Sequence, residues 1–425
     1  FIFLQENKFF RKKTLNLINS INFKNKSDLL SFKIDNILIG DLVYDTYLKD
    51  TGNPTINLND PVFQSLLIKT INIFYYWKFF FDSNEVVAVI ISDSVYTNSM
   101  VSRISSYKKI STYQCNWNNI CRIDKKNFHA YSKFHFYKKD FESLSKFEQT
   151  KAMEITKKRI NMRLRGSTRI DDQIYTGHTS WHLDFGEKRI LTNSKKKKIL
   201  IASHGFIDAP HCYGPESIIF PDFYEWLIFL DKISKETDYE WYIKAHPHAM
   251  EKDYEILKKF LKDRPHLFEL PKQCTHNQLI NEGINCVLTV YGTIAWEYAY
   301  FEIPVISASK NNPHINYNFC VHAQNINEYE KMIKNFDDLK IDFNKKKIYE
   351  FYFMHNIFSR SNWLFNNHEK IMSDIQGYDN LAKFRFYEYW IANFDKNKKD
   401  SINKNIHDFL NTDHLYIKNK NILQD

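Results

Sequence analysis

The sequence predicts an α/β protein in which two Rossmann-like domains face a cleft and C-terminal helices pack back on the first domain. Short β-branched runs alternate with amphipathic helical segments along most of the 425 residues. Several of these runs end directly in a polar cluster, as strands do at a ligand-binding edge. The same pattern in both halves predicts an N-terminal domain at 1–190, a C-terminal domain at 191–345, and helices with a polar tail at 346–425.

Composition limits the classes of partner. With 43% hydrophobic residues the chain can bury a large core, and its net charge of +9 favours anionic partners such as nucleotides. The basic residues are scattered, so we expect no nucleic-acid partner. Six cysteines match neither a zinc ribbon nor a dense disulfide framework, which favours a reducing cytoplasm. Gln64 and two lysines interrupt Phe63–Phe81, so we expect a buried amphipathic helix there; peripheral membrane contact stays open.

The first half is expected to form a strand, a helix and a second strand. Asn36–Ile39 and Val86–Ile91 resemble strands, and the apolar residues between them have helical spacing. Asp41 and Asp93 follow these strands and would line the carboxyl edge of a parallel sheet. Each could act as a catalytic base from across the cleft, or could simply cap the next helix.

The middle of the chain is less regular. Ile110–Tyr113 is a candidate third strand, and Lys139–Leu164 is rich in helix formers. The polar stretch Gly166–Arg189 is either a mobile loop over the active site or a solvated surface connection.

The second half contains three strands that each end in a polar cluster. These clusters are Ser203–Gly205, Lys244–His248 and Thr289–Thr293. If the strands are parallel neighbours, right-handed crossovers place all three clusters at one edge of the sheet, facing a shared pocket.

The central stretch is Asn285–Ser309, in which a strand, a glycine turn and a helix start follow one another. Backbone N–H groups and the helix dipole there would point at an anion, so Gly292 and Thr293 are predicted to form the floor of a phosphate site. Glu297, one helical turn later, is placed for a sugar or ribose hydroxyl. The alternative is a crossover that binds no ligand.

Lys244 and His246 would form an electropositive notch beside this site. They could neutralise the phosphate of a departing nucleotide without requiring a metal. Asp208 is the first candidate to take the proton from an acceptor hydroxyl, ahead of Asp41 and Asp93. A zinc site is an alternative interpretation, and its ligands would be His204, His211, His246 and His248.

The run from Lys244 to Pro247, followed by Thr289–Thr293, Glu297 and Pro304-Val305, resembles the nucleotide-binding half of GT-B glycosyltransferases. The closest match is to bacterial capsule and surface-polysaccharide biosynthesis proteins, which include Kdo transferases. The resemblance covers residues 199–322 and departs at Trp296, where a smaller residue is expected.

This resemblance implies a glycosyltransferase of EC class 2.4. The donor would be a nucleotide-sugar, such as a CMP-linked one, and the acceptor a lipid-linked capsule or lipopolysaccharide glycan at the inner face of the bacterial cytoplasmic membrane. Alternatives are a glycerophosphate-type transferase, a non-catalytic nucleotide-sugar or glycan-binding protein, and a sugar-nucleotide epimerase. The complete predicted donor-binding set is His204, Gly205, Lys244, His246, Thr289, Tyr291, Gly292, Thr293, Glu297, Asn312 and His314.

Overall fold

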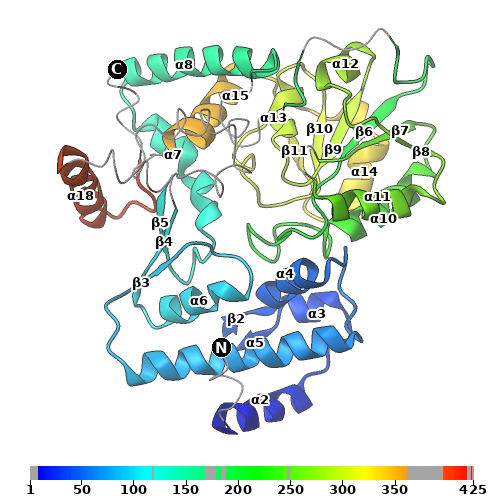
Figure 1. Cartoon of the computed structure of the whole chain (residues 1–425). Coiled ribbons are helices and arrows are strands. Elements are labelled where there is room, and N and C mark those ends of the chain that lie inside the picture. The colour runs from blue at the N-terminus through cyan, green and yellow to red at the C-terminus, as the bar shows by residue number, and fades with distance from the viewer. Residues whose placement is uncertain are drawn as a thin grey trace.

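The computed structural model describes residues 8–116, 119–167, 179–182, 188–246, 249–360, 396–418 and 423 (Figure 1). Two α/β halves lie against each other: an N-terminal half from α2 to β5 and a C-terminal half from β6 to α14. The predicted fold class, with two halves and with C-terminal segments packed on the first, is confirmed.

A six-stranded sheet forms the centre of the C-terminal half. Its order is β11-β10-β9-β6-β7-β8, and every neighbouring pair is parallel. The strands are β6 (Lys198–Ala202), β7 (Glu240–Lys244), β8 (Leu267–Glu269), β9 (Cys286–Thr289), β10 (Val305–Ser307) and β11 (Val321–His322). Each strand predicted for residues 199–307 is therefore confirmed.

Helices cover both faces of this sheet because alternate residues of each strand point to opposite sides. Ile199 and Ile201 of β6 belong to one hydrophobic cluster, whereas Leu200 between them belongs to another. The first cluster includes residues of α10 (Phe223–Ser234), α11 (Glu251–Leu261) and α14 (Ile326–Lys334). The second includes residues of α8 (Lys146–Leu164), α12 (His276–Asn281), α13 (Ile294–Ala299) and α15 (Lys345–Tyr352).

The sheet of the N-terminal half is smaller. Its strands are β3 (Ala88–Ile91), β4 (Ser111–Cys115) and β5 (Ile120–Ile123), with β3 and β4 parallel and β5 antiparallel to β4. The helices are α2 (Lys8–Ser20), α3 (Lys26–Leu30), α4 (Gly40–Thr51), α5 (Pro61–Ser83), α6 (Met100–Tyr107) and α7 (Tyr137–Glu142). The helix predicted between the first two strands is confirmed as α5, although α4 and β5 were not predicted.

The parallel strand expected at Asn36–Ile39 is wrong. The chain forms a hairpin of two-residue strands there, β1 (Lys33–Ile34) and β2 (Ile37–Leu38). Asp35 and Asn36 have φ of 49° and 65°, the positive pair that a tight antiparallel turn requires. The residues after β2 enter α4, in which every position from Gly40 to Leu48 is buried. Such a helix has no polar face, so its helical periodicity could not be seen in the sequence.

The C-terminal segment packs on the sheet of the N-terminal half. After α18 (Lys396–Leu410), Ile417 N–H donates to the Ile120 carbonyl at 3.1 Å. The Arg122 guanidinium donates to the carbonyls of Phe409 and Thr412 at 2.9 and 2.8 Å. The helix predicted at residues 369–394 lies outside the described residues. In the described part of the chain, no helix combines the length and apolarity needed to cross a bilayer.

Candidate functional site

The strand order creates a switch point between β6 and β9. From β6 the chain moves outward through β7 and β8, then returns beside β6 and moves the other way through β9, β10 and β11. Ligands of open parallel sheets bind at the carboxyl ends of strands where the direction reverses. A cavity of about 420 Å³ lies there, and residues after β6, β7 and β9 line it. The predicted convergence of the three polar clusters is confirmed.

Lys244 brings a buried positive charge to this cavity. Its side chain is 4% exposed, and its ammonium lies 3.5 Å from the Lys272 carbonyl. Burial lowers the pKa of Lys244, and the nearby Cys274 acts in the opposite direction. Among the described residues no carboxylate forms an ion pair with Lys244. A buried cation without a counter-charge is costly, so an anion bound in the cavity would be strongly stabilised.

Arg163 and Glu297 form an ion pair on another wall. Nε and Nη2 of Arg163, from the last turn of α8, lie 2.8 and 2.7 Å from Oε1 of Glu297. The second carboxylate oxygen accepts no hydrogen bond from the residues that the structure describes, so it remains available to a hydroxyl in the cavity. Arg163 was not predicted as a site residue, because its partner is 134 residues away in the sequence.

The loop before β6 also reaches the cavity. Thr179, Ser180 and Trp181 lie on its wall. Their position supports the interpretation of residues 166–189 as a loop over the site, although 168–178 and 183–187 lie outside the described residues.

His204 holds the loop after β9 in place. Its Nε2 accepts hydrogen bonds from the N–H groups of Val290 at 3.1 Å and Tyr291 at 3.3 Å, while its ring stacks on Phe223 with centroids 4.6 Å apart. Burial, together with the neighbouring His246, lowers the pKa of His204 to about 3. The imidazole is therefore neutral, and it positions the cavity wall instead of supplying a charge.

Gly292 is required by the geometry of this loop. Its N–H donates to Thr289 Oγ1 at 3.2 Å, and a Cβ at this position would lie 2.7 Å from the same oxygen. Because this N–H already donates to Thr289, Gly292 does not offer it to a phosphate as predicted. The N–H groups of Thr293 and Ile294 have no hydrogen-bond partner in the described structure, so they are the donors that the loop leaves for a ligand.

His246 follows β7 and lines the cavity as predicted, half-buried. Pro247 and His248 lie outside the described residues. Of the four proposed zinc ligands, the structure therefore describes His204, His211 and His246. The part of the chain that the structure describes contains no group of three or more His, Cys, Asp or Glu residues suited to a metal ion. His211, another proposed ligand, is engaged with Asp45 instead.

Three predicted donor-binding residues do not line the cavity. Asn312 is buried and donates to Ser307 Oγ at 2.9 Å. His314 is buried against the Phe351 ring with centroids 4.7 Å apart, and burial lowers its pKa well below the usual value. Gly205 lies beside Asp253. Asn312 and His314, in the turn after β10, therefore use their side chains for contacts inside the protein.

The three carboxylates predicted as catalytic bases, Asp41, Asp93 and Asp208, are not among the residues that line the cavity. The expectation that Asp41 faces a cleft is wrong: it is 1% exposed and binds Arg103 through contacts of 2.6 and 3.0 Å. Burial would raise the pKa of Asp41, but Arg103 holds it below the usual value. Asp93 and Asp208 both lie near Tyr96, whose hydroxyl donates to the exposed Asp208 at 3.0 Å. Burial and then these carboxylates raise the pKa of Tyr96.

No protein-family model and no curated protein matches the sequence. Among solved structures, the chain is similar to the UDP-GlcNAc 2-epimerase of Methanocaldococcus jannaschii in complex with UDP-GlcNAc and UDP. The sequence identity is 12% and the TM-score is 0.32, and the match covers 67% of this chain and 79% of the epimerase chain.

Two further similarities are to a transferase and to a polymerase. For KpsC, the beta Kdo 2,4 transferase of Thermosulfurimonas dismutans, the sequence identity is 9% and the TM-score is 0.35. The match covers 62% of this chain and 78% of the KpsC chain. For the wall teichoic acid polymerase TagF, identity is 16%, the TM-score 0.24, and coverage 46% of both chains. All three TM-scores lie below 0.5, so the functional assignment rests on the geometry of the site.

Proposed function

We propose that this protein is a glycosyltransferase whose nucleotide-sugar donor binds in the cavity between β6 and β9. The observation that carries the proposal is Lys244, a buried cation at the switch point without a carboxylate partner among the described residues. A donor phosphate would supply the missing counter-charge. The cavity volume of about 420 Å³ is also in the range of small-molecule sites.

Each wall of the cavity has a role in this scheme. Lys244 and His246 stabilise the negative charge that develops on the leaving nucleotide. The N–H and hydroxyl of Thr293 donate to a phosphate oxygen. The second carboxylate oxygen of Glu297 accepts from a ribose or sugar hydroxyl, while His204 fixes the loop that presents these donors.

We assign the acceptor to the side where the two halves meet. Asp208 is the first candidate for the base, because it is exposed and its partner Tyr96 belongs to the opposite half; Asp93 is the second. The resemblance noted above supports a lipid-linked capsule or lipopolysaccharide glycan as acceptor, with peripheral contact at the cytoplasmic face of the bacterial inner membrane. It also makes CMP-linked sugars the first donors to test.

Donor binding is tested by thermal-shift measurements with CMP, CDP, UDP, GDP and dTDP and their sugar derivatives. A nucleotide bound at 100 times its Kd raises stability by about 2.7 kcal/mol, which is readily seen as a higher unfolding midpoint. If none of these compounds at millimolar concentration shifts the midpoint, the proposal fails.

Transfer is tested with the His246→Ala variant. We expect the variant to lose sugar transfer while its unfolding midpoint stays unchanged, because His246 is half-buried at the cavity. Normal turnover would remove His246 from the mechanism. The product mass separates the alternatives, since a glycosyltransferase adds a sugar and a glycerophosphate-type transferase adds a phosphodiester, while an epimerase converts the donor without an acceptor.

A further inference from the structure

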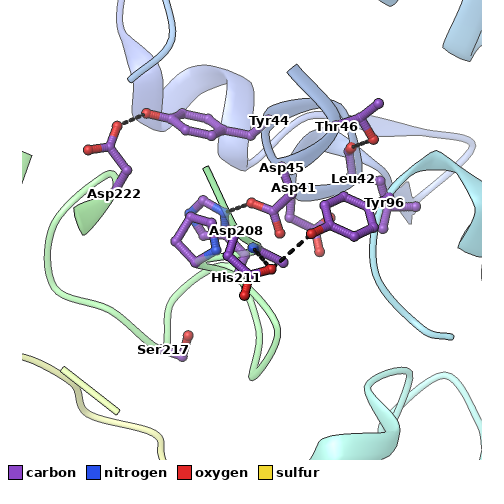
Figure 2. Close-up of polar contacts among 12 residues, drawn as sticks. Asp41, Leu42, Tyr44, Asp45, Thr46, Tyr96, Asp208, His211, Ser217 and Asp222 are labelled. Atoms are coloured by element: carbon purple, nitrogen blue, oxygen red, sulfur yellow. Dashed lines mark hydrogen bonds and ion pairs between the residues drawn. The ribbon is translucent and has the colours of Figure 1, made fainter. Parts of the chain in front are cut away.

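A buried Asp–His pair joins the two halves of the molecule. Nδ1 of His211, in the loop after β6, lies 2.6 Å from Oδ1 of Asp45 on α4 (Figure 2). The two side chains are 0% and 3% exposed. The Tyr44–Asp222 and Tyr96–Asp208 hydrogen bonds cross the same interface. The segment from Asp208 to Asp222 therefore carries several of the contacts that attach the N-terminal half to the C-terminal half.

The same loop encloses the hydroxyl of Tyr291. This hydroxyl donates to the Pro210 carbonyl at 2.8 Å and lies 2.6 Å from Ser217 Oγ. Gly214 N–H closes the turn between them by donating to the His211 carbonyl at 2.9 Å. Residues on both sides of His211 thus hold the ring of Tyr291, and Tyr291 in turn lines the cavity.

Among the described residues of the turn from Pro210 to Ser217, His211 is the only one that makes a buried contact with a charged side chain of the other half. Burial alone would lower the pKa of His211, but the carboxylates of Asp45, Asp41 and Asp222 raise it. Burial raises the pKa of Asp45 to about 6, against the opposing effect of His211. Removing one member leaves a buried group without its partner, so the turn would lose its preferred position.

We propose that the Asp45–His211 pair positions Tyr291, so that docking of the N-terminal half shapes one wall of the cavity in the C-terminal half. His211 acts through Tyr291 and is a positioning residue. The nature of the ligand is taken from the proposed function, but the positioning itself does not depend on it.

Hydrogen–deuterium exchange of the whole unliganded protein tests the positioning without any ligand. In a His211→Leu variant we expect amides in residues 288–297 to exchange about ten-fold faster, because local opening becomes easier. A His211→Asn variant should restore slow exchange, since its amide nitrogen can take the place of Nδ1 and donate to Asp45. Unchanged exchange in His211→Leu, or equal exchange in the Asn and Leu variants, would overturn the proposal.

Tyr44→Phe is the matched control. It removes a buried hydrogen bond across the same interface, to Asp222, while keeping the ring that packs against His211 with centroids 5.1 Å apart. We expect its exchange in residues 288–297 to match that of the wild type. Equally fast exchange in Tyr44→Phe would assign the effect to docking in general and would overturn the specific role of His211.

Titration calorimetry with UDP and with CMP extends the test to binding. We expect the His211→Leu variant to bind either nucleotide about ten-fold more weakly than the wild type, and Tyr44→Phe to bind normally. Equal affinity in the wild type and His211→Leu would contradict the coupling. If the wild type binds neither of these nor any other compound of the thermal-shift screen, the proposed function fails, and the exchange experiment alone decides whether the Asp45–His211 pair positions Tyr291.

Discussion

Asp41 in the N-terminal half and Lys244 in the C-terminal half are equally buried charges near the ends of strands, yet they have opposite surroundings. Asp41 is paired with Arg103 through both of its oxygens, whereas Lys244 faces a cavity and has no carboxylate partner in the described structure. A charge that is paired inside the protein, as Asp41 is with Arg103, holds the architecture together. A buried charge that lacks such a partner at a sheet edge marks a place for a ligand.

Topology explains why the two halves differ. The six parallel strands of the C-terminal half reverse direction between β6 and β9, which opens a crevice at their carboxyl ends. In the three-stranded sheet of the N-terminal half, β3 and β4 are parallel, and β5 is antiparallel to β4. Asp41, which follows the separate hairpin of β1 and β2, meets Arg103 of α6 inside this half and not a ligand cavity.

The largest expected effect comes from breaking the internal pair. Asp41→Ala leaves the Arg103 guanidinium buried without its partner, and the free energy of unfolding should fall by about 3–5 kcal/mol in denaturant titrations. A Glu255→Ala variant, which breaks an exposed pair with Lys252, should leave the unfolding midpoint unchanged. Equal stability of Asp41→Ala and the wild type would show that Asp41 is not architectural.

The second prediction concerns Lys244, the buried charge that has no carboxylate partner among the described residues. Lys244→Met removes a buried cation while keeping its volume, so the variant should unfold at the same or a higher temperature. Its affinity for the nucleotide that the wild type binds should fall about 100-fold, because one charged contact to phosphate is lost.

Lys198→Met is the matched control, because Lys198 is also buried but lies at the opposite end of neighbouring β6, near Glu240. We expect its affinity to be that of the wild type. Undiminished binding by Lys244→Met would contradict the proposed site.

A smaller effect is expected for Gly292→Ala. The added Cβ would displace Thr289 Oγ1 and the loop that it holds, so donor affinity should fall about ten-fold, with about 1–3 kcal/mol lost in stability. Gly205→Ala is the control, since its Cβ would make an ordinary contact of 3.5 Å with Asp253. Equal affinities in the two variants would show that the Gly292 turn does not shape the site.

The smallest expected effect is the pH dependence of the interface between the halves. The pKa values of His211 and Asp45 are both raised in the folded protein, so the folded state binds more protons than the unfolded state. Their contribution to stability is therefore greatest in mild acid and is lost as pH rises through the pKa of His211. Between pH 6 and 8.5 the unfolding midpoint of the wild type should fall more steeply than that of His211→Asn. Parallel curves would contradict this assignment.

The sequence predicted the C-terminal half well because its signals are local. Each strand is a short apolar run, and the polar clusters that include Lys244 and Gly292 follow these strands directly. Parallel packing then determines that they meet. The N-terminal half was predicted less well because α4 is buried on all sides and because the turn at Asp35 made a hairpin resemble a single strand.

Two parts of the site could not be predicted because they depend on distant pairing. Arg163 reaches Glu297 only after α8 has packed on the C-terminal half, and no local pattern marks that contact. The turn after β10 suggested that Asn312 and His314 would bind the donor. Their side chains pack inside the protein, which residue type alone does not reveal.

The most direct test of the central claim is a crystal structure of the protein with UDP or CMP, whichever gives the larger thermal shift. We expect a phosphate oxygen within about 3.2 Å of both Lys244 Nζ and a donor group of Thr293, in the cavity between β6 and β9. A well-ordered nucleotide elsewhere, for example in the groove between Leu30 and Pro221, with the Lys244 cavity unchanged, would contradict it.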